Sequence, residues 1–171
     1  DLIQKARFLA TQSRDDAPHY QHSQIGYNYR MSNILAGIGR GQFEVLREHV
    51  IQRRTINSWY RSYMSSIEGI DFQTEPNIDY YSNFWLTAIT IDPRVVGVTR
   101  EEVRLKLLEE NIESRPLWKP MHLQPIFKDA IYFGYGVSDN LFVQGLCLPS
   151  GSNLKEPELD RIHNTLCSIF R

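Results

Sequence analysis

The chain has 171 residues, of which 42% are hydrophobic and 23% are charged, and this balance excludes an intrinsically disordered chain. Its 19 lysines and arginines against 20 aspartates and glutamates give a formal net charge of −1, which argues against bulk electrostatic binding of nucleic acid or of an anionic membrane. No apolar run approaches the ~20 residues that span a bilayer. Cys147 and Cys167 lie outside any C-x-x-C motif, a usage typical of cytoplasmic proteins, so we expect a cytoplasmic location.

The first part of the chain is predicted to be helical. Apolar residues at helical spacing indicate the end of a packed helix over residues 1–10, and the polar segment 11–25 indicates a loop. Ser32 is a suitable N-cap for a proline-free stretch from Asn33 to about Ile67, which predicts one long helix or two placed end to end. Six arginines and two glutamates lie between residues 27 and 64. We interpret these arginines as a solvated helix face, with phosphate binding as the alternative.

A composition shift near Gly69 marks the end of the long helix. Thr99 and Glu102 form a T-x-x-E capping box, which predicts a helix ending near Asn111. The segment 72–82 is predicted to be a loop. The other predicted elements are strands at 84–91, 112–117 and 146–149, short helices at 125–132 and 138–145, and a last helix beginning near Pro157. The order predicts an α/β protein with a helical part at 1–68 and a small α/β domain at 69–171.

Common catalytic and metal-binding motifs have weak signals in this chain. His19 and His22 have a spacing that suits one helical face, but they lie in a predicted loop without a third nearby ligand, so no metal site is predicted. Neither Cys147 nor Cys167 is expected to have a histidine partner, and both are interpreted as packing residues. No glycine-rich phosphate loop of the G-x-x-x-x-G-K-S or G-x-G-x-x-G type occurs.

The segment 26–32 places Asn28 and Arg30 just before the N-terminus of the long helix. An amide and a guanidinium at this position can hold a phosphate through directed hydrogen bonds and the helix dipole. The alternative is an ordinary N-cap turn, which also favours short polar residues.

The segment 115–125 contains three prolines at positions 116, 120 and 125, which predict a stiff loop. This loop is expected to display Trp118, Lys119, His122 and Gln124, a set that suits a polar, anionic ligand such as a nucleotide-sugar. The alternative is a proline-rich connection whose Trp118 covers the core.

Three segments together resemble one known family. IGYNYRMSNILAGIGRGQFEVL, SRPLWKPMHLQPIF and LFVQGLCLPSGSNLKEPELDRI occur in this order and resemble the C-terminal part of the DegT/DnrJ/EryC1/StrS family. The opening KARFLATQSRD resembles the segment that follows the family's cofactor lysine. These proteins are sugar aminotransferases of fold type I that depend on pyridoxal 5'-phosphate. The resemblance implies a long helix followed by a small mixed or antiparallel sheet with flanking helices.

The resemblance also implies that the catalytic residues lie upstream of Asp1. None of the five lysines, at positions 5, 106, 119, 128 and 155, occurs in the sequence context of the family's Schiff-base lysine. Residues 1–68 would then be the end of the large cofactor-binding domain with the interdomain helix, and residues 69–171 the whole small domain. Such a fragment has no catalytic residue of its own and is expected to be inactive alone.

Family members form homodimers with shared active sites, which implies a role for each candidate residue. Asn28 would hold the cofactor phosphate of the partner subunit, and Arg30 and His122 would bind the nucleotide-sugar. The resemblance implies transfer of an amino group, with glutamate as the usual donor, to a keto-sugar in glycan biosynthesis.

The sequence RPLWKPMH resembles the corresponding sequences of family members that act on UDP-linked 4-keto-6-deoxy-N-acetyl sugars. A dTDP-linked or GDP-linked keto-sugar is the alternative substrate, and a sugar dehydratase of the same fold is the alternative enzyme. From the residues alone, a non-catalytic binding domain with an interaction face along 33–67 is a further alternative.

Overall fold

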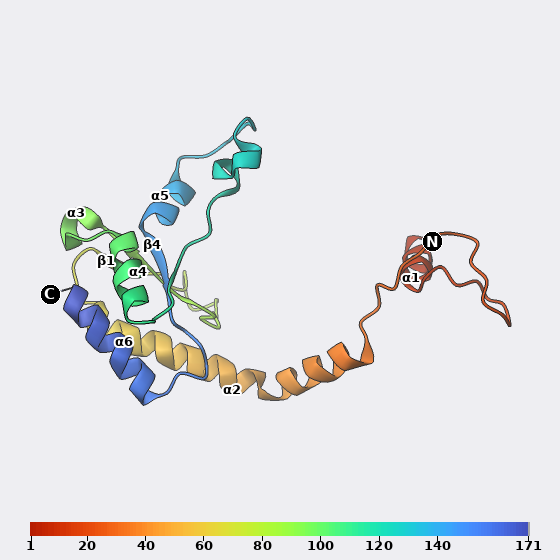
Figure 1. Cartoon of the computed structure of the whole chain (residues 1–171), viewed down its shortest axis with the longest axis horizontal. Helices are drawn as coiled ribbons and strands as arrows, with labels where there is room; N and C mark the ends of the chain where they lie inside the picture. The colour runs from red at the N-terminus through yellow and green to blue at the C-terminus, as the bar shows by residue number, and fades with distance from the viewer. Residues whose placement is uncertain (171) are drawn as a thin grey trace. The chain divides into compact units, whose positions relative to one another are not determined.

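The computed structural model describes residues 1–170, which form two compact units divided within helix α2 (Asn33–Met64) (Figure 1). The first unit comprises residues 1–46, and the second begins at Arg47. This division by contacts falls within the long helix, whereas the domain boundary between residues 68 and 69, predicted from the composition shift and from the family resemblance, stays a prediction.

In the first unit, a returning segment lies against the end of helix α1 (Leu2–Ala10). The backbone N–H groups of Tyr27 and Tyr29 donate to the carbonyls of Leu9 and Ala10, both at 3.0 Å. A side chain at Gly26 would collide with Ser13, which is fully buried, so glycine is required for this close approach. Helix α1 has no fully buried residue among those described, and the predicted packed face is exposed at Leu2 and Ile3 and half-buried at Leu9 and Ala10.

Helix α2 is one continuous helix of 32 residues, and Ser32 caps it through a 3.2 Å hydrogen bond from the Leu35 N–H. Its first half exposes its apolar residues, whereas its second half buries Ile56, Tyr60 and Met64, which are spaced four apart on one face. The long helix and its N-cap are therefore confirmed.

The second unit is built on an antiparallel sheet of four strands in the order β1-β2-β4-β3. The strands are β1 (Ile70–Phe72), β2 (Thr87–Ile91), β3 (Arg115–Pro116) and β4 (Gly145–Leu148). Three strands were predicted and are confirmed with shifted ends, while β1 was missed because three residues carry too short a pattern. Strand β2 starts at Thr87 and not at the predicted residue 84, since Phe84 adopts a positive φ of 43°.

The turn before β1 depends on Gly69, which has φ +84°. A β-carbon there would lie 2.8 Å from Cβ of Val95 in the short helix α3 (Pro93–Val96), so both the conformation and the space require glycine. Helix α3 was not predicted.

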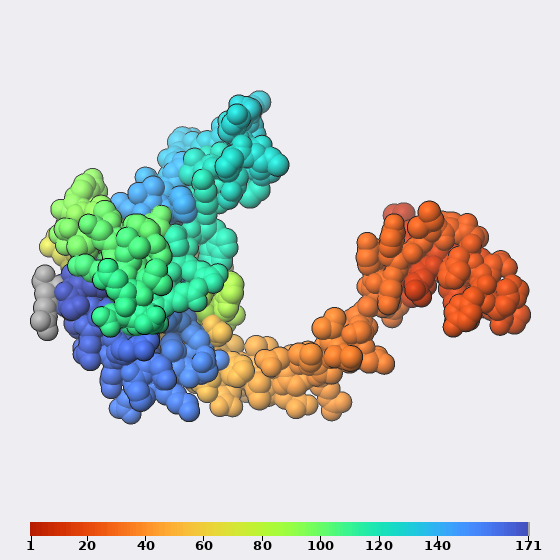
Figure 2. All heavy atoms as spheres, in the orientation of Figure 1, coloured from red at the N-terminus to blue at the C-terminus, as the bar shows by residue number. Residues whose placement is uncertain are grey.

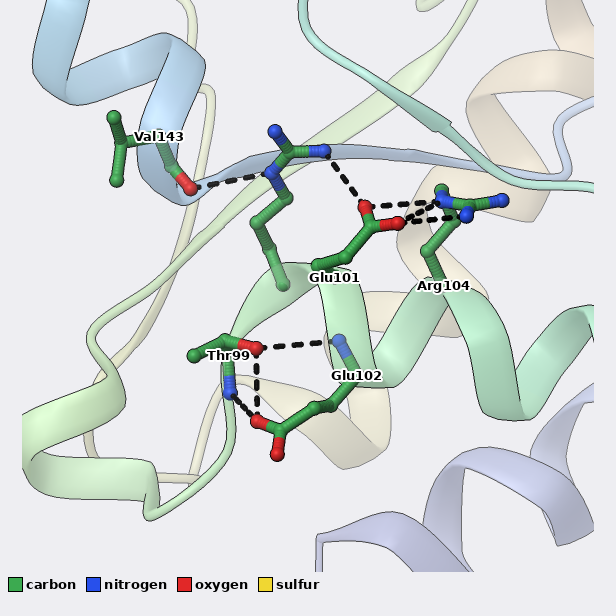
Figure 3. A network of polar contacts seen from close by, with 6 residues as sticks. Thr99, Glu101, Glu102, Arg104 and Val143 are labelled. Carbon is green, nitrogen blue, oxygen red and sulfur yellow. Dashed lines mark hydrogen bonds and ion pairs between the residues drawn. The ribbon is translucent and has the colours of Figure 1, made fainter.

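The remaining helices are α4 (Arg100–Glu109), α5 (Val137–Gln144) and α6 (Glu156–Ile169), with 3-10 turns η1 (Met121–Leu123) and η2 (Pro125–Phe127). The predicted capping box of α4 is confirmed: Thr99 N–H donates to Glu102 Oε2 at 2.7 Å, and Glu102 N–H donates to Thr99 Oγ1 at 3.2 Å (Figure 3). The predicted helix at 125–132 is wrong beyond the single turn of η2.

One hydrophobic core joins the sheet to α2, α4 and α6. Alternate residues of β2 enter it, because successive side chains of a strand point to opposite faces. Its buried members are Ile56, Tyr60, Met64, Ile70, Ile89, Ile91, Val103, Leu107, Ile112, Leu146, Leu148, Ile162, Leu166 and Ile169.

Three arginines of α2 bind the loop between β1 and β2, through its carbonyls or through the side chain of Glu75. Arg53 donates to the carbonyls of Trp85 and Ser150, and Arg61 donates to that of Gln73 at 2.8 Å. Arg54 forms a 2.9 Å ion pair with Glu75. The interpretation as a solvated face is therefore wrong for these three, because they hold the loop between β1 and β2 in place, whereas the other three arginines, Arg30, Arg40 and Arg47, are exposed.

The Arg54–Glu75 ion pair makes stability depend on pH. The hydrogen bond from Arg54 lowers the pKa of Glu75 below its usual range, so the folded state prefers the carboxylate. This stabilisation is fully present above the unfolded-state pKa of about 4.3 and is lost as the pH falls through the lower folded-state pKa.

We therefore expect Glu75→Gln to lower the urea midpoint at pH 7, with the difference from the parent protein shrinking toward pH 3. Urea unfolding of both proteins at several pH values measures this, with Glu68→Gln, at an exposed position, as the control. A difference that is the same at every pH would contradict the prediction.

Candidate functional site

The proline-rich loop forms an arm, residues 117–136, that stands out from the rest of the second unit (Figure 2). Trp118 and Lys119 are exposed on it, as predicted. His122 and Gln124 are instead half-buried, and Gln124 donates from its amide to the Lys119 carbonyl at 3.4 Å. The arm therefore presents part of the predicted set and holds the rest against its own backbone and side chains.

His122 is held by two other residues of this region. Its Nε2 lies 2.6 Å from Oδ1 of Asp139, in the first turn of α5. Its ring stacks on Tyr132 with centroids 3.7 Å apart and planes inclined by 19°. The side chain of His122 is 18% exposed, so its ring is mostly enclosed but reaches solvent. This arrangement presents an oriented imidazole to a ligand.

The arm is anchored to the sheet where it begins, and α5, which follows it, is anchored to α4. Leu117 N–H donates to the Gly145 carbonyl at 3.2 Å, and Arg100 Nε donates to the Val143 carbonyl at the end of α5, also at 3.2 Å (Figure 3). A side chain at Gly145 would collide with Leu117 and with the Leu141 carbonyl, so glycine is required where α5 meets β4. The arm is thus fixed at its base.

Trp118 extends over Trp85 and not over the core. The two indole rings have centroids 6.1 Å apart, and their side chains remain 68% and 57% exposed respectively. They form a wall shared by two hollows of about 380 and 450 Å³. The alternative in which Trp118 covers the core is therefore wrong.

The first hollow is lined by apolar surface and by a few polar groups. Ser114 lines it and has a buried hydroxyl without a hydrogen-bond partner among residues 1–170. Cys147 also lines it, and burial raises the pKa of its thiol, so this cysteine stays protonated at neutral pH and is a poor nucleophile. The hollow therefore offers the unpartnered hydroxyl of Ser114 for binding and no reactive thiol at Cys147.

Cys167 is an exception to the expectation about cysteines. Its Sγ lies 3.4 Å from Nε2 of His163, one turn earlier on α6. The expectation that neither cysteine has a histidine partner is wrong for Cys167, and the spacing of four residues on a helix could have shown this.

Asn28 and Arg30 belong to the first unit and both side chains are exposed. Asn28 forms an isolated antiparallel bridge with Thr11, and its neighbours in sequence, Tyr27 and Tyr29, stack their rings on each other. Arg30 lines a shallow hollow together with residues of α1. The amide of Asn28 can therefore donate to a phosphate, which is compatible with the role implied for it.

The lysines do not fit a covalent role toward a cofactor. All five are exposed, and Lys5 is engaged with Gln24 and lies over the Phe8 ring. A lysine that reacts with a carbonyl needs an environment that lowers its pKa, such as burial. The residues present therefore fit the phosphate contact of pyridoxal 5'-phosphate and not its covalent attachment.

His19 and His22 bind protein groups. His19 Nε2 lies 3.2 Å from Gln21 Oε1, and His22 Nδ1 lies 2.9 Å from the Gln12 carbonyl oxygen. Across the described part of the chain, no three histidine, cysteine or acidic side chains are grouped as metal ligands. None of the helices described there is long and apolar enough to cross a membrane.

Tyr132, Asp139 and Trp85 were missed by the sequence analysis. Trp85 was taken as part of a strand, and an acidic residue in the first turn of a helix is common for reasons of the helix dipole alone. Gly136, with φ +74°, is the N-cap of α5, which puts Asp139 in the first turn of that helix. No local signal in the sequence links Asp139 to His122.

Comparison with known proteins gives consistent matches. The sequence profile of the DegT/DnrJ/EryC1/StrS aminotransferase family matches residues 1–167. EpsN of Bacillus subtilis, whose name describes a pyridoxal phosphate-dependent aminotransferase, is 48% identical over 172 residues, covering 98% of this chain and 43% of EpsN. A GDP-perosamine synthase of Caulobacter vibrioides is 31% identical over 172 residues, covering 99% of this chain and 46% of that protein.

The fold matches as well. The aminotransferase TlmJ from Streptoalloteichus hindustanus has a TM-score of 0.83 with 18% identity, covering 98% of this chain and 44% of TlmJ. This confirms the predicted fold, a portion of a fold type I aminotransferase with a long helix and a small antiparallel sheet. The chain spans less than half the length of these relatives. On this evidence, the chain belongs to the DegT/DnrJ/EryC1/StrS aminotransferase family.

Proposed function

We propose that this chain is part of a pyridoxal phosphate-dependent aminotransferase that transfers an amino group from glutamate to a nucleotide-linked keto-sugar in glycan biosynthesis. The observation that carries the proposal is the oriented imidazole of His122 on the anchored arm, within a chain matched by the family profile over residues 1–167. We further propose that the enzyme is a cytoplasmic homodimer with shared active sites.

The residues of this chain would bind and orient the reactants. The cofactor, when bound, supplies the electrophilic carbonyl and the electron sink of amino transfer. Asn28 would donate its side-chain amide to the cofactor phosphate in the partner subunit's site. Arg30 would pair with the charged nucleotide portion, and His122 would hydrogen-bond the sugar-nucleotide. Because the five lysines are exposed, the covalent lysine would come from another part of the protein, and this chain alone would be inactive.

We propose a UDP-linked 4-keto-6-deoxy-N-acetylhexosamine as the acceptor, on the likeness of residues 115–122 to family members acting on such sugars. A GDP-linked keto-sugar is the second candidate, because the relative with 31% identity is named a GDP-perosamine synthase. The two candidates share the diphosphate and the ketone and differ in the base and in the acetamido group.

The full-length enzyme tests the proposal. Incubated with cofactor and glutamate, it is expected to convert the UDP-linked keto-sugar to an amino sugar, detected by mass spectrometry, with higher kcat/KM than for a GDP-linked 4-keto-6-deoxyhexose. Preference for the GDP-linked sugar would support the second candidate. Loss of water without amino transfer would indicate a dehydratase, and no reaction with either sugar would contradict the proposed function.

A further inference from the structure

We propose that Asp139 is a positioning residue that keeps the proton of His122 on Nε2, so that Nδ1 meets the sugar-nucleotide as a hydrogen-bond acceptor. The ligand group facing Nδ1 would then be a hydroxyl or an amide N–H and not a phosphate oxygen. The identity of the ligand rests on the proposed function, whereas the state of the imidazole does not.

The first step of the argument is the assignment of the proton. A carboxylate accepts hydrogen bonds and has no proton to donate, so a contact of 2.6 Å between Asp139 Oδ1 and Nε2 requires an N–H on Nε2. In a neutral imidazole this leaves the lone pair on Nδ1.

The second step is that Nδ1 is available. Within residues 1–170, the His122 ring is hydrogen-bonded through Nε2. Nδ1 is not among the buried polar atoms without a hydrogen-bond partner. Because the His122 side chain is 18% exposed, we take Nδ1 as the ring nitrogen open to a ligand.

The third step is that the ring is held in one orientation. Tyr132 stacks on it at 3.7 Å with nearly parallel planes, and rotation of the imidazole would break both this contact and the bond to Asp139. Asp139 is itself carried by α5, whose end is tied to α4 by the Arg100–Val143 hydrogen bond of 3.2 Å. The acceptor atom is thus pre-organised before a ligand arrives.

The fourth step is the consequence for selectivity. An unprotonated nitrogen attracts a hydroxyl or amide N–H and is disfavoured next to a phosphate oxygen, since both would be acceptors. Sugar hydroxyls and the acetamido N–H of an N-acetylated sugar provide the required donor.

The imidazole state can be measured without a substrate. In the full-length enzyme with ¹⁵N-labelled histidine, imidazole NMR is expected to show a proton on Nε2 of His122 and none on Nδ1, with its signal assigned through His122→Gln. Asp139→Ala is expected to convert this signal to a mixture of both tautomers. The matched control is Asp129→Ala, which removes an exposed carboxylate of the same arm and is expected to leave the signal unchanged.

A ring protonated on both nitrogens would present a donor to a phosphate and would overturn the acceptor assignment. An unchanged His122 signal in Asp139→Ala would overturn the positioning role.

Kinetics then separate positioning from a merely structural contact. We expect Asp139→Ala to raise KM for the keto-sugar about tenfold with kcat within about twofold, because a lost hydrogen bond of ordinary strength changes binding by this factor. The KM of Asp139→Asn is expected to lie between those of the parent enzyme and of Asp139→Ala, since the amide oxygen of asparagine can still accept from Nε2–H. An unchanged KM, or a loss of thermal stability and of kcat without a rise in KM, would overturn the proposal. If neither keto-sugar is turned over, the proposed function fails while the NMR result still decides the role of Asp139.

Discussion

Replacing Asn28 by alanine in the full-length enzyme is expected to lower its affinity for pyridoxal 5'-phosphate by about ten- to a hundredfold. Under the proposed function, the substitution removes one charge-assisted hydrogen bond to the phosphate, and such bonds contribute roughly 1.5–3 kcal/mol. The exposed amide in the first unit has no role in the core, so the fold is expected to be retained. Titration of the apoenzyme with cofactor, followed by absorbance, measures the affinity.

Arg30→Ala is the matched comparison, because Arg30 lies two residues away and is also exposed. We expect it to leave cofactor affinity nearly intact and to raise KM for the keto-sugar. Loss of cofactor affinity in both variants, or in neither, would contradict the roles assigned to these residues.

A subunit-mixing experiment tests whether Asn28 serves the partner's site. Subunits carrying Asn28→Ala are mixed with subunits that lack the covalent lysine. If the site is shared, each hybrid dimer contains one intact site and is expected to have about half the activity of the parent dimer. No recovery despite proven subunit exchange would place Asn28 in its own subunit's site.

Replacing Leu107 by alanine is expected to destabilise the protein by about 2–5 kcal/mol. Leu107 is fully buried in the core between the sheet and the helices, so its truncation loses apolar burial and leaves a cavity. Because native proteins are stable by only about 5–15 kcal/mol, the variant is expected to unfold at much lower denaturant concentration. Urea unfolding followed by circular dichroism measures the change.

Leu108→Ala provides the control on the same helix. Leu108 is 52% exposed, so the same chemical change is expected to cost less than about 1 kcal/mol. Equal destabilisation by the two substitutions would contradict the placement of the core on one face of α4.

Much of the local structure could be predicted because its signals act within one turn of helix or one strand. Ser32 and the Thr99–Glu102 capping box mark helix starts through bonds that span three residues. The apolar spacing of the last helix, with Ile162, Leu166 and Ile169 buried, is equally local. The resemblance of three segments in the same order to one family allowed the family and the fold to be predicted.

The candidate site could be predicted only in part, because its contacts join distant residues. His122 was singled out, but its partner Asp139 is 17 residues away, on a helix whose position depends on the sheet. The contact of Trp85 with Trp118 depends likewise on which strands become neighbours. Propensity and periodicity describe one element at a time and carry no information on such pairs.

The sequence by itself therefore determined the long helix, its cap, the capping box of α4, the amphipathic last helix and the membership in the family. The tertiary structure alone decided the three-residue strand β1, the loop-binding role of Arg53, Arg54 and Arg61, and the orientation of His122. The physical reason is the range of the interactions. Caps and helical faces arise from neighbours along the chain, whereas strand order and side-chain pairs across the fold form only when the core brings separate elements together.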